Sequence, residues 1–117
     1  MREVRQRREV RGRRAERLAR LFLWLKGYRC LRARYRSPVG EIDLICRRGR
    51  VLAFIEVKAR PRLDDAAAAI TPPQLARIRR ASAHFLASQP GLAECDCRID
   101  AVLVAPGRWP RHLQSIG

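Results

Sequence analysis

The sequence predicts an α/β domain in which a mixed β-sheet is flanked by helices. Two apolar, β-branched segments, residues 40–46 and 51–58, are separated by a short basic turn, which is typical of a β-hairpin. Apolar residues recur at helical spacing over residues 13–26 and again after Thr71. The element order is α-β-β-β-α-β, with a weak last strand. Because a helix connects the third and fourth strands, we expect those two to be parallel, with a right-handed crossover.

Length and composition indicate one globular domain. The chain has 117 residues, of which 47% are hydrophobic, enough for a buried core. No run of about 18 apolar residues exists that would span a membrane, and the N-terminus lacks the apolar segment of a secretory signal. We therefore expect a cytoplasmic protein with reduced cysteines. Cys95-Asp96-Cys97 is too closely spaced for a zinc-binding Cys pair, and Cys30 and Cys46 stand alone, so all four are expected to be buried thiols.

The net charge is +15, and residues 1–36 carry +11 of it. Such a charge favours a polyanionic partner, nucleic acid before a membrane surface. A basic domain without such a partner is the plainer alternative. Residues 1–12 contain five Arg and two Glu but no apolar stripe, so we expect a flexible basic arm there, followed by a domain over residues 13–117.

The first helix is predicted over residues 13–26 and ends before Gly27. Its expected apolar face consists of Ala15, Leu18, Ala19, Phe22, Leu23 and Leu25. Glu16 lies at the edge of this face, where it can pair with Arg13 or Arg20 at helical spacing. A strand with alternating arginines follows over residues 28–36, and residues 37–40 form the turn into the hairpin.

The hairpin gathers acidic residues among apolar ones. If Arg48 and Gly49 are the turn residues, Asp43 and Glu56 share one face of the sheet, roughly 7–8 Å apart as diagonal neighbours. A four-residue loop gives the same register, whereas a three-residue loop puts the two carboxylates on opposite faces. One interpretation is an ion pair of Lys58 with Glu56 or Asp43. The other is a site for a hard cation, favoured because Lys58 is one of only 2 lysines beside 24 arginines.

Beyond the hairpin, residues 62–70 have no firm period and are predicted to form a mobile loop. Thr71 then caps a helix that has Pro72 at its first position and Gln74 at its third, as in a capping box. Its expected apolar face comprises Leu75, Ile78, Ser82, Phe85 and Leu86. Residues 97–105 form the fourth strand, and residues 109–113 a turn and a short edge strand. His84 and His112 are assigned to packing or to the surface.

The order Asp43, twelve residues, Glu56-Val57-Lys58 resembles the active-site motif of the restriction-endonuclease-like nuclease superfamily. More closely, the segments 40–45 and 54–60 are similar to the YraN-like family of bacterial proteins, which is related to archaeal Holliday-junction resolvases. The similarity extends from Gly12 to the C-terminus. It includes Arg14-Ala15-Glu16, Lys26-Gly27-Tyr28, Thr71-Pro72 and Arg98-Ile99-Asp100-Ala101-Val102. The resemblance implies a restriction-endonuclease-like core.

The resemblance also implies a metal site. Asp43, Glu56 and the Val57 carbonyl would bind Mg²⁺ or Mn²⁺, with Lys58 orienting water or stabilising negative charge. Glu16 and Glu41 are further candidates, acting through water. Arginines on both helices and the strands would hold phosphates. The candidates are Arg13, Arg17, Arg32, Arg34, Arg36, Arg60, Arg77 and Arg80.

We therefore expect a metal-dependent nuclease that hydrolyses phosphodiester bonds in DNA, with branched or flapped DNA as a candidate substrate. The alternative is a non-catalytic, basic nucleic-acid-binding adaptor with a structural carboxylate–lysine cluster. No motif separates DNA from RNA, and the sequence leaves monomer and homodimer open.

Overall fold

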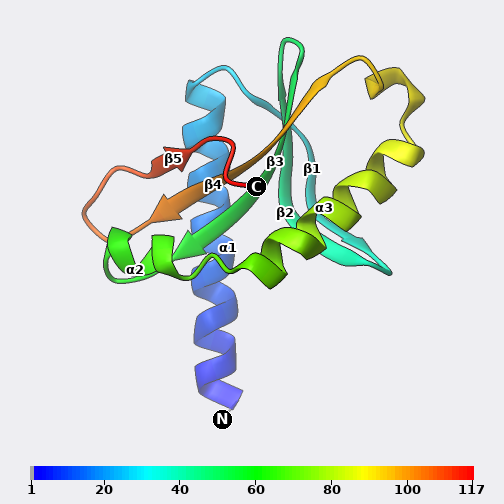
Figure 1. Cartoon of the computed structure of the whole chain (residues 1–117). Coiled ribbons are helices and arrows are strands. Elements are labelled where there is room, and N and C mark those ends of the chain that lie inside the picture. Colours follow the sequence, from blue (N-terminus) through cyan, green and yellow to red (C-terminus); the bar gives the residue numbers. More distant parts are fainter. Residues whose placement is uncertain (1) are drawn as a thin grey trace.

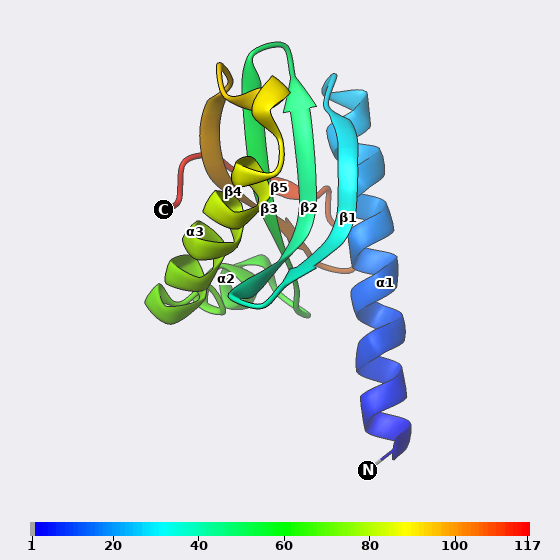
Figure 2. The same cartoon turned by 90° about the vertical axis from the view of Figure 1, so that its right-hand side faces the viewer.

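The computed structural model describes the backbone of residues 2–117 and the side chains from Gly12 onward. A five-stranded sheet lies between helix α1 (Arg2–Leu25) on one face and helix α3 (Pro72–Ala87) on the other, as Figures 1 and 2 show. The remaining elements are β1 (Arg29–Ser37), β2 (Gly40–Arg48), β3 (Val51–Ala59), α2 (Leu63–Ala68), a 3₁₀ turn (Pro90–Leu92), β4 (Asp96–Val104) and β5 (Arg111–Leu113). The described residues include no helix long and apolar enough to cross a membrane.

The sheet has the order β1-β2-β3-β4-β5. Strands β3 and β4 are parallel, and every other neighbouring pair is antiparallel. The helical connection between β3 and β4 explains this arrangement, because parallel neighbours need a crossover long enough to return to the same end of the sheet. The predicted α/β class, its mixed sheet and its parallel pair are confirmed.

The hairpin register differs from the predicted one by two residues. Arg48 pairs with Val51, so the turn residues are Gly49 and Arg50 rather than Arg48 and Gly49. Gly49 has a φ of 59°, in the left-handed region that a tight hairpin turn requires and that glycine adopts most easily. A shift of two residues leaves the paired residues 44–48 and 51–55 on their predicted faces, because the period of a strand is two. Ile42 is an exception, since it packs in the same cluster as Ile45, so the alternation breaks at Asp43.

Helix α1 buries a narrower stripe than its apolar pattern predicts. Ala15, Ala19 and Leu23, spaced four residues apart, are fully or almost fully buried against the sheet. Leu18 and Leu25, expected in the core, are 41% and 64% exposed. The expectation was wrong for these two residues, because small alanines bring the helix close to the sheet and only its innermost row of side chains is covered.

Helix α1 begins at Arg2, whereas the sequence predicted a helix only from residue 13. Met1 and the side chains of residues 1–11 lie outside what the structure describes, so the role of the predicted basic arm stays a prediction. In Figure 1 the N-terminal half of the helix extends past the edge of the sheet.

Helix α3 begins as predicted. The hydroxyl of Thr71 accepts a hydrogen bond from the Gln74 amide, and the Gln74 side chain accepts one from the Thr71 amide. These reciprocal bonds satisfy two helix-terminal donors. Ile78, Ser82 and Phe85 are buried on the predicted face, together with Ala81.

The segment predicted as a mobile loop contains helix α2. Asp64 and Asp65 lie in its first turn, where carboxylates interact favourably with the helix dipole. Ala66 is completely buried against Ala101 and Leu103 of β4. Helical periodicity is hard to recognise in six residues, and the contact with β4 comes from the tertiary fold.

The cysteines are free thiols, but not all of them are buried. Cys46 is buried, Cys30 and Cys95 are partly exposed, and Cys97 is exposed. Cys97 therefore corrects the prediction. It lies near the start of β4, two residues before Ile99, the first buried residue of that strand. Cys30 and Cys46 are direct cross-strand partners in β1 and β2, which the sequence did not indicate.

Candidate active site

Asp43 lies where strands β1 and β2 are distorted. Arg34 of β1 has a φ of 54°, unusual for a residue other than glycine, and it falls between the ladder pairs Ala33–Leu44 and Tyr35–Ile42. On β2 the β2–β3 ladder ends at Leu44, so Asp43 is the next position beyond it. There the Oδ2 atom of Asp43 accepts a hydrogen bond of 2.8 Å from the backbone amide of Val57.

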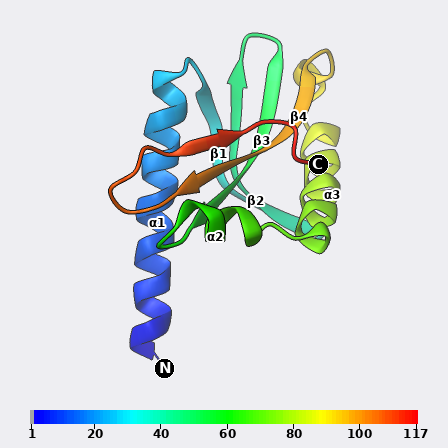
Figure 3. The same ribbon diagram turned by 60° about the vertical axis from the view of Figure 1, so that its left-hand side comes forward.

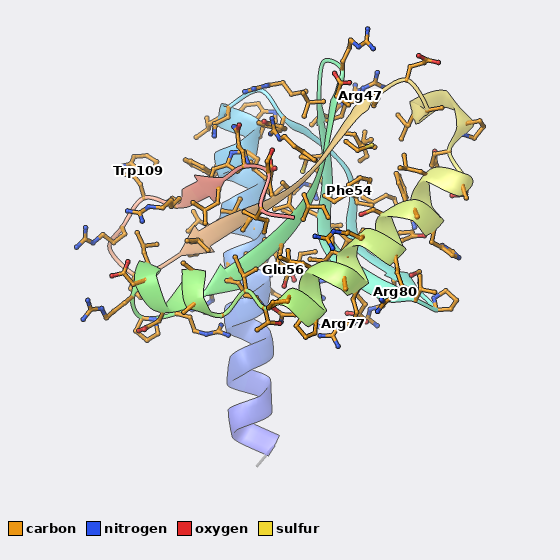
Figure 4. All side chains as sticks on the ribbon, viewed as in Figure 1. Arg47, Phe54, Glu56, Arg77, Arg80 and Trp109 are labelled. Atoms are coloured by element: carbon orange, nitrogen blue, oxygen red, sulfur yellow. The ribbon has the colours of Figure 1, made fainter. Side chains whose placement is uncertain are left out.

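Glu56 and Lys58 lie beside this bond on β3. The Nζ atom of Lys58 is 3.2 Å from Oε1 of Glu56, and their side chains are only 12% and 15% exposed. Burial raises the pKa of Glu56, while the Lys58 ammonium and the charge of Arg77 partly oppose this. Figure 4 shows Glu56 on β3, with Arg77 on the neighbouring helix α3. The ion pair predicted as one interpretation is therefore formed, with Glu56 as the partner.

Asp43 and Glu56 influence one another electrostatically. Burial, followed by repulsion from the Glu56 charge, raises the pKa of Asp43 to about 7, against its ordinary value of 3.8. The hydrogen bond from the Val57 amide opposes this rise. A carboxylate in this position is short of positive charge, and a divalent cation is a species that could supply it.

Glu16 and Glu41 lie differently with respect to this site. Glu16, on α1, forms an ion pair with Arg34 at 2.9 Å, and its charge also contributes to the raised pKa of Asp43. Glu41 is 3.7 Å from Arg36, and both side chains are largely exposed. Glu16 is therefore close enough to act on the charge of Asp43, whereas Glu41 lies near Asp43 with a largely exposed side chain.

A hollow of about 280 Å³ opens next to Asp43. Its lining combines α1 with the first two strands. The residues are Gly12, Arg13, Glu16, Arg34, Arg36, Glu41, Ile42 and Asp43. Three of the eight predicted phosphate-binding arginines, Arg13, Arg34 and Arg36, thus line the same hollow as Asp43.

The other predicted arginines are dispersed. Arg77 acts on Glu56 from α3, while Arg60 directs a guanidinium nitrogen to the carbonyl of Ala59. Arg32 lies over the ring of Tyr35, in a second hollow away from Asp43. Arg17 lines a third hollow, and Arg80 is exposed on α3. The fold therefore gathers only part of the predicted set around the carboxylates.

The residues present are compatible with a hard divalent cation. Asp43 and Glu56 supply oxygen ligands, and Mg²⁺ needs only one or two carboxylates because it retains several waters. In the described part of the chain, no group of three His, Cys, Asp or Glu side chains is close enough to hold a metal ion. A cation at this position would thus depend on water and substrate oxygens for its remaining ligands.

One polar cluster was missed by the sequence analysis. Asp100, completely buried in β4, accepts hydrogen bonds from Arg98, His112 and the Ser115 amide. The Nδ1 atom of His112 is 2.6 Å from Nζ of Lys26, which can only donate, so His112 accepts there and donates to Asp100 through Nε2. Figure 3 shows β5, which carries His112, alongside β4.

This cluster joins the C-terminal segment to the end of α1. Burial alone would raise the pKa of Asp100, but the hydrogen bonds from His112, Arg98 and Ser115 outweigh it and hold the pKa at about 2. Arg98 also donates to the Tyr28 hydroxyl at 2.6 Å. The signal in the sequence that could have indicated this cluster is the presence of two charged residues, Arg98 and Asp100, in an otherwise apolar strand.

The five-stranded mixed sheet between α1 and α3 is a restriction-endonuclease-like fold. A search of solved structures agrees with this, since the Holliday junction resolvase Hjc of Archaeoglobus fulgidus matches with a TM-score of 0.61. The match covers 86% of this chain and 73% of the resolvase at 20% sequence identity, which establishes likeness of fold.

The chain belongs to the uncharacterised protein family UPF0102, whose model matches residues 15–104. A UPF0102 protein of Parvibaculum lavamentivorans is 56% identical over 102 residues, covering 87% of this chain and 77% of the relative. A Caulobacter vibrioides relative with the same description is 51% identical over 102 residues, covering 87% and 82%. The family membership predicted from the sequence motifs is confirmed.

Proposed function

We propose that this protein is a metal-dependent nuclease that hydrolyses phosphodiester bonds in DNA. The observation that carries the proposal is the electrostatic coupling of Asp43 with Glu56 and Lys58. Asp43 also lines a hollow together with Arg13, Arg34 and Arg36, whereas Glu56 and Lys58 do not line it. The likeness of fold to a Holliday junction resolvase supports the same class of activity and favours branched or flapped DNA.

Each residue of the site has a role that follows from its position. Asp43 and Glu56 would hold Mg²⁺ or Mn²⁺, and the Val57 carbonyl is a further candidate ligand. When bound, the cation would lower the pKa of a coordinated water and offset charge on the phosphate. The Lys58 ammonium, kept within 3.2 Å of Glu56, would donate a hydrogen bond to the attacking water or to the phosphate oxygen that gains charge. Glu16 would accept from water at the rim of the site.

The surrounding arginines would bind the nucleic-acid backbone. Arg13, Arg34 and Arg36 line the same hollow as Asp43, so a phosphate held by them would lie next to the carboxylates. Contacts to phosphates do not distinguish one base sequence from another. We therefore propose a nuclease that recognises the shape of its substrate.

We also propose that the protein acts in the cytoplasm.

A cleavage assay tests the proposal. Linear, flapped and four-way DNA substrates, with an RNA strand for comparison, would be incubated with Mg²⁺ or Mn²⁺. Wild type should cut at least one substrate, and Asp43→Asn should reduce the rate by a factor of 100 or more. A matched control is Asp96→Asn, because Asp96 is exposed at the start of β4, where it pairs with Val51, five residues before Glu56 on β3. Equal rates for wild type and Asp43→Asn would refute the proposal.

The second candidate is a nucleic-acid-binding adaptor whose carboxylates are structural. The Glu56–Lys58 ion pair favours it, since each charge already has a partner. The raised pKa of Asp43 also allows this carboxyl to be neutral near pH 7. An adaptor would bind the same DNAs without cutting them under any divalent cation, and its affinity would not change in Asp43→Asn.

A further inference from the structure

Helix α1 exposes a tryptophan on the side that faces strand β1. Trp24 is 65% exposed, and Leu21, one turn earlier, is 53% exposed. Leu18 and Leu25 of the same helix are also exposed, by 41% and 64%. A group of exposed apolar side chains on one side of a helix marks an interaction surface. The sequence analysis assigned no role to Trp24.

The surroundings of Trp24 are basic. A hollow of about 340 Å³ is lined by Trp24 and Leu21 together with Arg17, Arg20 and Arg29. Arg17 and Arg20 precede Trp24 by seven and four residues on α1, and Arg29 is the first residue of β1. Positions spaced in this way lie on one side of a helix, so Arg17 and Arg20 share the side of α1 that carries Trp24, and Arg29 lines the same hollow from β1.

Arg17, Arg20 and Arg29 form no ion pair with a carboxylate among residues 12–117. The arginines and lysines that do form such pairs there are Arg34, Arg36, Lys58 and Arg98. The hollow therefore combines an aromatic face with uncompensated positive charge. A purely apolar partner would leave these charges without counterions, whereas a polyanion with flat, apolar rings would satisfy both features.

The Trp24 hollow and the hollow beside Asp43 are separate, but both are lined by residues of helix α1 and strand β1. Glu16 of α1 is bound to Arg34 of β1 at one end, and Trp24 lies near Arg29 at the other. Helix α1 and strand β1 therefore run in opposite directions past one another. Eight residues separate Glu16 from Trp24, about 12 Å along the helix axis. A short stretch of nucleic acid can span that distance.

We propose that this hollow binds the single-stranded part of the nucleic-acid substrate. One base stacks on the Trp24 indole, and Arg17, Arg20 and Arg29 contact the adjacent phosphates. A single strand is required because the bases of a duplex are stacked on one another and do not present a free face. This inference rests on the proposed function. It takes the bound single strand to be the part of the nuclease substrate that leads away from Asp43 and Glu56.

Tryptophan fluorescence provides a test that needs neither metal nor cleavage. The chain has two tryptophans, so Trp109→Phe leaves Trp24 as the only source of tryptophan fluorescence. Oligo-dT and oligo-rU should each quench Trp24, and the ratio of their affinities tells whether DNA or RNA is preferred. A duplex of equal length should bind with much less quenching. Trp24→Ala should lower the affinity for single-stranded nucleic acid about tenfold, because one stacking interaction with a base is lost. Trp24→Phe should retain most of the wild-type affinity.

The matched control is Trp109→Ala, in which another exposed tryptophan is removed. Trp109 is 80% exposed between β4 and β5, and Figure 4 shows it far from Glu56. It should leave single-strand affinity unchanged. Both alanine variants are at exposed positions, and a melting curve confirms that they fold.

Three results would overturn the inference. The first is a loss of less than twofold in Trp24→Ala, and the second is equal quenching by duplex and single strand. The third is a dimer without nucleic acid that dissociates in Trp24→Ala, because the tryptophan would then belong to a protein interface.

Asp43→Asn should still show quenching of Trp24 by single-stranded nucleic acid. Quenching without cleavage would refute only the nuclease proposal, and cleavage without quenching would refute only the Trp24 site.

Discussion

The carboxylate of Asp43 accepts its 2.8 Å hydrogen bond from the backbone amide of Val57, the residue between Glu56 and Lys58. This contact links the two strands of the hairpin just where their regular ladder ends at Leu44 and Ile55. It holds the Asp43 carboxylate next to the two charged side chains of β3. The predictions for the site depend on this arrangement.

Divalent cations should raise the melting temperature of the protein. Binding of Mg²⁺ or Mn²⁺ to Asp43 and Glu56 relieves their repulsion, so millimolar metal stabilises the native state by mass action. Asp43→Asn should abolish the rise, whereas Asp96→Asn should keep it. Thermal melts with and without metal measure the effect. No rise in wild type, together with strong destabilisation by Asp43→Asn, would assign the carboxylates a structural role.

Without metal, the stability difference between wild type and Asp43→Asn should depend on pH. The pKa of Asp43 is raised to about 7, so the folded state holds this proton more tightly than the unfolded state does. The wild type therefore loses stability as the pH rises from about 4 through 7. The Asn amide oxygen can still accept the Val57 bond but carries no charge. At pH 8 the variant should be more stable by about 2 kcal/mol, and denaturant titrations at pH 5 and pH 8 check the trend.

Lys58→Ala should separate metal binding from catalysis. The carboxylates remain, so the metal-induced rise in melting temperature should persist. Cleavage should fall by a factor of 100 or more because no ammonium stabilises the developing charge. Lys58→Arg tests whether a compact ammonium is needed, and we expect little recovery. A cleavage rate within threefold of wild type in Lys58→Ala would remove Lys58 from the mechanism.

Removal of Asp100 should destabilise the fold in a pH-dependent way. Its pKa of about 2 lies below the ordinary value of 3.8, so its charged form stabilises the native state above pH 4. This contribution is lost as the pH falls through 2. Asp100→Asn should therefore cost about 2 kcal/mol at pH 7, and the difference from wild type should shrink toward pH 2. Denaturant curves measure it, with Asp96→Asn as the exposed control.

Nucleic-acid binding should weaken steeply with salt. The net charge of +15 implies binding through phosphates, which releases counterions. Affinity for a DNA duplex should fall at least tenfold between 50 and 200 mM salt, as measured by fluorescence anisotropy. An affinity that stays constant over this range would exclude phosphate-driven binding.

Deletion of residues 2–12 should lower the affinity for nucleic acid without unfolding the domain. The segment carries five arginines and precedes Ala15, the first buried residue among the described side chains. The melting temperature should change by less than about 2 °C, and the slope of affinity against salt should decrease. A large drop in melting temperature would instead place this segment in the folded core.

Local pattern was enough to predict much of this protein. Period-two alternation and the short basic turn predict the hairpin, because a strand side chain faces one side or the other regardless of its partners. Thr71, Pro72 and Gln74 predict the start of α3, because a capping box forms within four residues. The motif around Asp43 and Glu56 predicts the family, since it depends on residue identity and spacing alone.

Only the tertiary structure decided the features that depend on residues far apart in the sequence. The burial of Asp100 with His112 and Lys26 joins three separate elements, and no local period contains that information. Likewise, Leu18 and Leu25 follow the helical pattern but are exposed, because the area of sheet beneath α1 determines how wide a stripe is covered. The approach of Glu16 to Asp43 and the exposure of Trp24 beside Arg29 come from the same packing of α1 against β1, which sequence spacing cannot fix.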